Sequence, residues 1–149
     1  MEKFNGNQFD NLGKKIVVTG GAGYLGSILV PILLEKGYYV HVLDKLFFGK
    51  GILEKYEGNP NFKLTNIDIS HHENIPRLFE EVDAVIHLAS ISNDPSSDID
   101  PNLTIQTNFL ATVSLARRAK AEKVSRFIFI SSCSVYGAKI GRASCRERV

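Results

Sequence analysis

The chain has 149 residues, of which 44% are hydrophobic and 23% charged, and its formal net charge is +2. This length allows one domain with a buried core, and this composition is that of an ordinary globular protein and not of a disordered chain. Apolar runs stay well short of the roughly 20 residues of a membrane span. The polar start of the chain lacks the apolar centre of a secretory signal, so we expect a cytoplasmic protein with no membrane partner.

Short apolar strands alternate with helical patterns along the chain. The predicted strands are Lys15–Thr19, Tyr38–Asp44, Phe62–Ile67, Asp83–Ala89 and Arg126–Ser131, and the predicted helices are Tyr24–Lys36 with a kink at Pro31, His71–Glu81 shortened or bent by Pro76, and Asn102–Glu122. This alternation predicts an α/β fold with a doubly wound parallel sheet, covered by helices on both faces. We expect a flexible segment over residues 1–13 and a partial domain over residues 14–139, truncated after about the fifth strand.

A glycine-rich turn, Thr19–Gly26, connects the first predicted strand to the first helix. Gly21, Gly23 and Gly26 fit G-x-G-x-x-G, and Gly20 with the last two fits the looser G-x-x-G-x-x-G. Glycines there allow a tight turn, close approach of a pyrophosphate and close packing of helix on strand. The start of the helix adds free amides and a positive dipole end. Because a strand precedes the turn and a helix follows it, the pattern predicts the dinucleotide site of a Rossmann domain.

Asp44 ends the second predicted strand, 23 residues after Gly21. This is close to the roughly 20 residues expected for the acid that binds the ribose hydroxyls of a dinucleotide. Such a carboxylate repels a 2′-phosphate and so favours NAD over NADP, although Lys45 beside it would tolerate the phosphate. The alternative is that Asp44 is a solvated acid at a strand end.

The four histidines are predicted to be structural. His41 and His87 lie on predicted strands, where we expect them to be packed or hydrogen-bonded, and His71 and His72 look like a surface pair at the start of a helix. They stand in no HExxH pattern and have no cysteine partner, so we expect no metal site.

The last ten residues, 140–149, are predicted to be a non-native tail. They can be read, in one frame, as the translation of a widely used short-read sequencing adapter, and such scars are set aside in fold reasoning. The tail carries three arginines and one glutamate, so its net charge of +2 equals that of the whole chain. The rest of the chain is therefore neutral overall, and we expect no nucleic-acid partner. With Cys145 set aside, Cys133 is the only cysteine, and we expect neither a disulfide nor a zinc site.

Several motifs, in order along residues 14–139, resemble the extended short-chain dehydrogenase/reductase family, in its nucleotide-sugar epimerase and dehydratase branch. They are Thr19–Gly26, Asp68-Ile69, His87-Leu88-Ala89, Asn108-x-x-Ala111-Thr112 with Ala111 in place of the family's glycine, and Ser131–Gly137 ending in Val-Tyr-Gly. The resemblance implies NAD as cofactor, NADP being disfavoured. It also implies a nucleotide-sugar substrate for the full-length protein, and it leaves a homodimer, which is common in the family, as an option.

The resemblance further implies which residues contact the cofactor. They are Gly20, Gly23, Tyr24, Leu25 and Gly26 in the glycine turn and first helix, Asp44 and Lys45 after the second strand, Asp68 and Ile69 at the adenine, Leu88, Ala89 and Ser90 after the fourth strand, and Asn108 in the long helix.

Ser132 corresponds to the family's active-site hydroxyl, which hydrogen-bonds the substrate oxygen; the alternative is a serine that caps the fifth strand. In the family, a Tyr-x-x-x-Lys pair supplies the general base for hydride transfer to the nicotinamide. The sequence after Ser132 contains no such pair, and Tyr136 is not its tyrosine.

Cys133 is expected to be a small packing residue. Ser132–Ser134 stands where the family's dehydratases carry Thr-Asp-Glu, which disfavours dehydration.

We therefore predict the cofactor-binding half of an NAD-dependent nucleotide-sugar epimerase-like oxidoreductase, inactive as an isolated fragment. Two alternatives stay open, because a fold does not by itself determine a function. One is an NADP-linked reductase of the same family, and the other is a non-catalytic NAD(P)-sensing Rossmann protein. A Tyr-x-x-x-Lys pair in the full-length gene would favour the enzyme, and its absence would favour the sensor.

Overall fold

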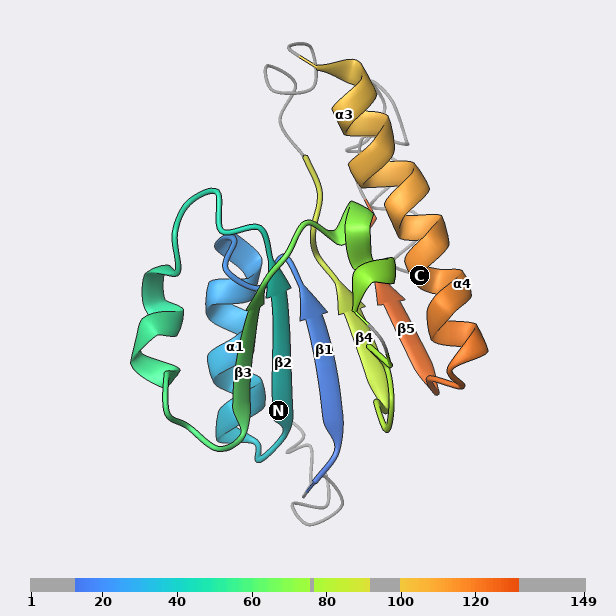
Figure 1. Ribbon diagram of the computed structural model, residues 1–149. Coiled ribbons are helices and arrows are strands. Elements are labelled where there is room, and N and C mark those ends of the chain that lie inside the picture. Colours follow the sequence, from blue (N-terminus) through green and yellow to red (C-terminus); the bar gives the residue numbers. More distant parts are fainter. Residues whose placement is uncertain (1–12, 76, 92–99, 132–149) are drawn as a thin grey trace, which may run out of the picture.

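A computed structural model describes residues 13–75, 77–91 and 100–131 of the chain. Parallel strands form one sheet in the order β3-β2-β1-β4-β5 (Figure 1). The strands are β1 (Lys15–Thr19), β2 (Tyr39–Asp44), β3 (Phe62–Asn66), β4 (Ala84–His87) and β5 (Arg126–Phe129). The chain starts at β1, builds outward on one side and then crosses to the other, which is the strand order of a Rossmann fold. The predicted doubly wound sheet is therefore confirmed.

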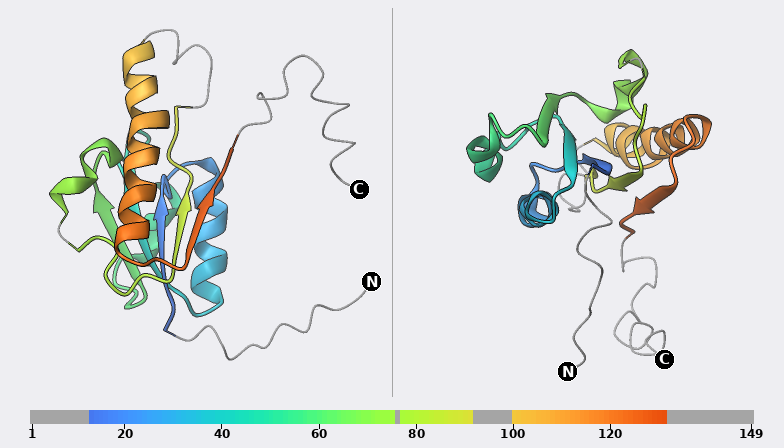
Figure 2. Two further views of the ribbon diagram at one scale, coloured as in Figure 1. Left: turned by 90° about the vertical axis from the view of Figure 1, so that its right-hand side faces the viewer. Right: turned by 90° about the horizontal axis from the view of Figure 1, so that it is seen from below.

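Helices cover both faces of this sheet. They are α1 (Tyr24–Glu35), η1 (Gly51–Tyr56), η2 (Ile69–Asn74), α3 (Pro101–Ile105), η3 (Gln106–Ala111) and α4 (Thr112–Ala121). Seen along the sheet, α1 and the α3–α4 helix lie on opposite faces (Figure 2). The last three helices are continuous, which confirms the long predicted helix, and the middle turn, η3, is π-helical. Among the described residues, none of the helices is both long and apolar enough to cross a membrane.

Alternating strand side chains build a core on each face of the sheet. The core on the α1 face consists of Ile16, Val18, Val40, Val42 and Ile86 from the strands, with Val30, Leu33 and Leu53 from α1 and η1. The core on the α4 face consists of Val17, Leu43 and Val85 from the strands, with Leu78, Phe79, Leu115 and Ala119. Because both faces are covered, the central strands are apolar at almost every position, which is why they could be recognised in the sequence.

The helix predicted over residues 71–81 is wrong in its extent, although it ends just before Pro76, where the sequence predicts shortening or bending. η2 is a short 3₁₀ helix that ends at Asn74, and the chain then turns, with Arg77 and Glu81 in the left-handed region at φ 51° and 58°. Pro76 accounts for the break, because proline lacks a backbone donor and disfavours helical conformation in the residue before it.

Arg118 of α4 anchors this irregular segment. Its guanidinium donates to the carbonyl oxygens of His72 and Ile75, and its Nε donates to Glu122 at 2.7 Å. Glu122 in turn accepts the backbone N–H of Phe79 at 2.8 Å. His72 is therefore 4% exposed and bonded to α4, so the prediction of a surface pair is wrong for His72 although His71 is exposed.

Candidate functional site

The glycine turn lies directly against the end of β4. Gly20 has a φ of +69°, and its N–H donates to the Leu43 carbonyl of β2 at 2.8 Å. A Cβ at Gly20 would stand 2.6 Å from the backbone nitrogen of Ala89 and 2.7 Å from its Cα. Two motifs that are about 70 residues apart in the chain are thus in backbone contact, and only glycine permits that contact.

The start of α1 fits a phosphate group. A Cβ at Gly26 would lie 2.3 Å from the Gly21 carbonyl oxygen, so the helix packs on the turn as closely as the motif predicts. At Gly23 an added Cβ would meet only the Gly20 carbonyl oxygen, at 3.2 Å, so the turn is open at its outer side. The first amides of an α-helix have no acceptor within the helix, which is the feature that makes helix starts suitable for phosphate groups. The side chains of Tyr24 and Leu25 point outward, 83% and 53% exposed.

Asp44 is tied to this turn by hydrogen bonds. Its Oδ2 accepts the N–H of Ala22 at 2.9 Å, and its Oδ1 accepts the N–H of Leu46 at 2.7 Å. Each carboxylate oxygen can accept more than one hydrogen bond, so the group keeps capacity for ribose hydroxyls. The structure therefore brings the predicted ribose acid and the predicted phosphate cradle together.

Lys45 and Asp68 form an ion pair beside Asp44. The ammonium of Lys45 lies 2.7 Å from Asp68 Oδ2, while Asp68 Oδ1 accepts the N–H of Ser70 at 3.0 Å and its Oγ–H at 2.6 Å. Burial alone would raise the pKa of Asp68, but the hydrogen bonds from Lys45 and Ser70 outweigh it and lower the pKa to about 2. The side chain of Ile69 is buried, which leaves its backbone as the part that could reach a ligand.

His87 is the centre of a buried hydrogen-bond chain between the turn and the long helix. Thr112 Oγ1 donates to the Asn108 carbonyl at 2.9 Å, so it must accept from His87 Nε2 at 2.8 Å. His87 Nδ1 consequently accepts from Thr19 Oγ1 at 2.5 Å, since a neutral imidazole has one donor and one acceptor. Burial lowers the pKa of His87 to about 4. The prediction that His87 is a hydrogen-bonded structural residue is confirmed.

Asn108 uses its side chain to hold the segment that follows β4. Its Oδ1 accepts the N–H of Ile91 at 2.8 Å, and its Nδ2 donates to the carbonyl of Ile91 at 2.7 Å. This pairing assigns Asn108 a positioning role for the predicted cofactor residues Leu88, Ala89 and Ser90, of which Ser90 is exposed. Direct contact between Asn108 and the cofactor stays a prediction.

The sequence did not predict some residues of this site, and some of the residues that it did predict are not among those that the structure describes. It did not single out Thr19, or the amides of Ala22 and Leu46 that hold Asp44; a threonine ending a buried strand just before the glycines was the available signal. Ser132, Cys133 and Tyr136 lie outside the described residues, as do residues 1–12, residues 92–99 and the predicted tail.

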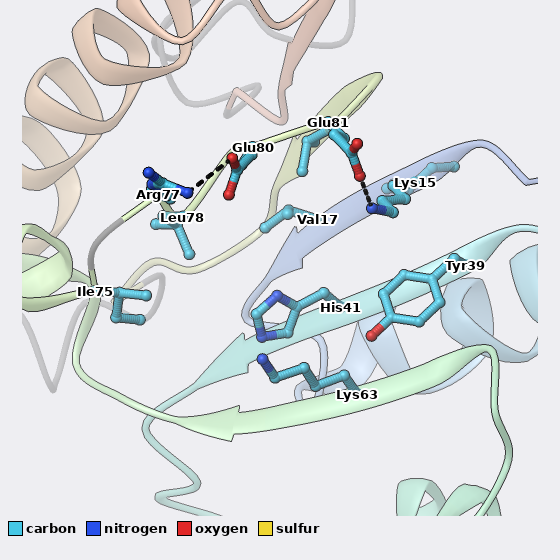
Figure 3. A pocket seen from close by; sticks show the side chains of 12 residues that line it. Lys15, Val17, Tyr39, His41, Lys63, Ile75, Arg77, Leu78, Glu80 and Glu81 are labelled. Atoms are coloured by element: carbon cyan, nitrogen blue, oxygen red, sulfur yellow. Dashed lines mark hydrogen bonds and ion pairs between the residues drawn. The ribbon is translucent and has the colours of Figure 1, made fainter.

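A hollow of about 260 Å³ lies at the opposite end of the sheet (Figure 3). It opens where β1, β2 and β3 begin, and its charged rim includes two ion pairs, Lys15 with Glu81 and Arg77 with Glu80. Ligands of open α/β sheets bind at the carboxyl ends of the strands, so we place the site at the glycine turn. Within the described ranges, no group of three or more His, Cys, Asp or Glu residues is arranged to hold a metal ion.

Known proteins resemble this chain in sequence and in structure. Residues 16–147 match the sequence model of the NAD dependent epimerase/dehydratase family. UDP-glucuronic acid decarboxylase 1 of Danio rerio is 37% identical over 125 residues, which are 83% of this chain and 28% of that protein. Because the family match extends to residue 147, the boundary of a non-native tail after residue 139 stays a proposal.

Two solved structures show the same arrangement. The dTDP-glucose 4,6-dehydratase DesIV of Streptomyces venezuelae, solved with NAD bound, has a TM-score of 0.76 and 30% identity, covering 83% of this chain and 41% of that one. The UDP-Glc/GlcNAc 4-epimerase of Campylobacter jejuni has a TM-score of 0.76 and 32% identity, covering 84% and 39%. The chain thus spans less than half the length of each of these proteins.

Proposed function

Because the chain belongs to the NAD-dependent epimerase/dehydratase family, we propose that it forms the cofactor-binding part of an enzyme that oxidises and reduces a nucleotide sugar with NAD. The observation that carries the proposal is the hydrogen bond from the Ala22 amide to Asp44. This bond ties the acid that we propose binds the ribose to the turn whose amides we propose bind the pyrophosphate. When bound, NAD would supply the hydride acceptor, and the residues of this chain would hold and orient it.

Replacing Asp44 by alanine is expected to weaken NAD binding about 10- to 100-fold. The loss corresponds to about one charge-assisted hydrogen bond from a ribose hydroxyl, worth about 1.5–3 kcal/mol. Titration calorimetry of the chain with NAD measures it, with Glu35→Gln at the other end of α1 as the control that keeps wild-type affinity. Unchanged affinity in the Asp44 variant would contradict the proposed site.

Turnover is proposed to need a longer protein than this chain. The relatives it matches are more than twice its length, and the β5 edge of the sheet leaves Ile128, Phe129 and Ile130 between 44% and 51% exposed. These apolar side chains suit a surface that further elements of the enzyme cover. Ser132 would orient the sugar hydroxyl, and the general base would come from a further part of the enzyme. The chain alone is therefore expected to bind NAD without epimerase activity.

A second candidate activity is decarboxylation of a nucleotide-linked uronic acid. It is favoured by the curated relatives, since several of them, from fish, frog and plant, are UDP-glucuronic acid decarboxylases. Both candidates begin with oxidation of a sugar hydroxyl by NAD, so the cofactor site does not distinguish them. Release of CO₂ from UDP-glucuronic acid by the longer gene product would select decarboxylation, and interconversion of two UDP-hexoses would select epimerisation.

We also propose a homodimer formed through the long helix. Ile105, Phe109 and Leu110 are 53%, 61% and 53% exposed, and they form an apolar surface at the α3–η3 junction. Sedimentation velocity is expected to show a concentration-dependent dimer that Phe109→Ser shifts to monomer, while the exposed control Lys120→Ser does not. A wild-type chain that stays monomeric at high concentration would contradict this surface.

A further inference from the structure

We propose that Asp68 sets the preference for NAD over NADP by occupying the Lys45 ammonium. The inference rests on the proposed function, because it concerns the adenosine end of the same cofactor site. It assigns Asp68 a role in specificity that is separate from any contact with the adenine.

Lys45 presents a difficulty for cofactor selection. NADP differs from NAD by a phosphate on the 2′ oxygen of the adenosine ribose, and a cation near that position commonly accommodates it. Lys45 directly follows Asp44, the residue that would face the ribose hydroxyls. An unpaired ammonium there would attract the phosphate that the Asp44 carboxylate repels.

The Lys45 ammonium contacts two partners, the carboxylate of Asp68 and the ring of Phe47. Lys45 Nζ lies 2.7 Å from Asp68 Oδ2 and 4.7 Å from the centre of the Phe47 ring. The Asp68 side chain is only 18% exposed, while that of Lys45 is 43% exposed. Because one partner is largely shielded from water, solvent and salt screen the pair less than an ion pair on the open surface. The ring adds a cation–π contact that favours the same position.

Asp68 is itself held in place by the sheet and by η2. The end of β3 is fixed to the end of β2, because Asn66 pairs with Asp44 and the N–H of Ile67 donates to the Asp44 carbonyl at 2.9 Å. Both donors of Ser70 bind Oδ1 of Asp68, which leaves Oδ2 for Lys45. These contacts already fix the position of the Asp68 carboxylate, so the Lys45 ammonium binds a group that is held in place.

The side chains of Asp44, Lys45 and Asp68 together carry a net charge of −1. A 2′-phosphate entering this corner would meet the Asp44 carboxylate without a free cation to compensate for it. Neutralising Asp68 would bring the sum to zero and release the Lys45 ammonium for the phosphate. NAD has no 2′-phosphate, so release of the Lys45 ammonium would favour NADP relative to NAD.

Asp68→Asn is the direct test, because asparagine keeps the size of the side chain and an acceptor for Ser70. In calorimetric titrations of the full chain, we expect the ratio of NADP affinity to NAD affinity to rise about tenfold. The double variant Lys45→Ala with Asp68→Asn is expected to lose the gain. Ser70→Ala, which leaves both charges in place, is expected to keep the wild-type ratio of NAD to NADP affinity.

Equal weakening of NAD and NADP binding by Asp68→Asn would overturn the inference alone, because Asp68 would then act only on the adenosine that both cofactors share. A gain in NADP affinity that survives the removal of Lys45 would overturn it as well. A wild-type chain that binds neither dinucleotide would overturn the proposed function, and this inference with it.

Discussion

Replacement of Gly20 by alanine is expected to abolish detectable NAD binding and to destabilise the fold, whereas the same replacement at Gly37 is expected to be mild. Both glycines are left-handed, with φ values of +69° and +82°, so each alanine variant incurs about 1–2 kcal/mol of backbone strain. The surroundings differ. A Cβ at Gly37 meets no heavy atom of the described residues within 4 Å, while at Gly20 it enters the backbone of Ala89.

Steric overlap at Gly20 is expected to cost about 1–3 kcal/mol more and to push the turn away from β4. The displacement would move the amides at the start of α1 and the Ala22 N–H that holds Asp44. Urea unfolding gives the stability difference between the two variants, and calorimetry gives their NAD affinities. Gly23→Ala provides a milder variant for binding, because its Cβ has a single close contact, at 3.2 Å. Equal stability and equal NAD affinity in the Gly20 and Gly37 variants would contradict the contact between turn and strand.

The folded protein is expected to lose stability steeply as the pH falls from 7 to 5. Burial lowers the pKa of His87 to about 4, and burial followed by the charge of Lys63 lowers the pKa of His41 to about 4. In the unfolded chain both histidines take up a proton near pH 6.5. Between these values the unfolded state binds more protons, so acid favours unfolding. Each histidine contributes a loss of about 2 kcal/mol between pH 7 and pH 5.

His87→Gln separates this effect from the loss of hydrogen bonds. The variant is expected to be about 1–3 kcal/mol less stable at pH 7, because Thr19 and Thr112 lose a matched partner. Between pH 7 and pH 5 its stability is expected to fall about 2 kcal/mol less than that of the wild type, since His41 and His72, whose pKa burial also lowers, still titrate. Urea midpoints measured across this range provide the comparison, with His71→Gln, at an exposed position, as the control that keeps the wild-type slope. An undiminished slope in the His87 variant would show that His87 is not the buried neutral group described above.

The family and the sheet were accessible from the sequence because their signals are local. Strand β1 was predicted with its observed bounds, and the glycine turn could be recognised from its spacing, since a turn between a strand and a helix involves only neighbouring residues. Asp44 could be placed by its distance along the chain from that turn. The predicted α/β class, the family and NAD as its cofactor are confirmed.

Tertiary packing decided the features that depend on distant residues. The sequence predicted a helix shortened or bent at Pro76, but it did not predict that Arg118, more than 40 residues away, binds the backbone carbonyls of His72 and Ile75. The same contact buries His72, which looked like a surface residue. Patterns along the chain report which face of an element is apolar, and they do not report which polar group from another element will satisfy an irregular backbone.

The division between what the sequence determined and what the tertiary structure decided is clearest around Asp44, Lys45 and the glycine turn. The sequence by itself determined that an acid follows a glycine turn at the spacing expected of a dinucleotide site. It also showed a lysine beside that acid, with opposite effects of the two on a 2′-phosphate. Only the folded chain brings Asp68, which follows β3 and precedes η2, to within 2.7 Å of that ammonium. Only the folded chain likewise brings Thr19, His87 and Thr112 into one chain of hydrogen bonds. The physical reason is that adjacent parallel strands end at one edge of the sheet, where side chains far apart in sequence come within reach of each other.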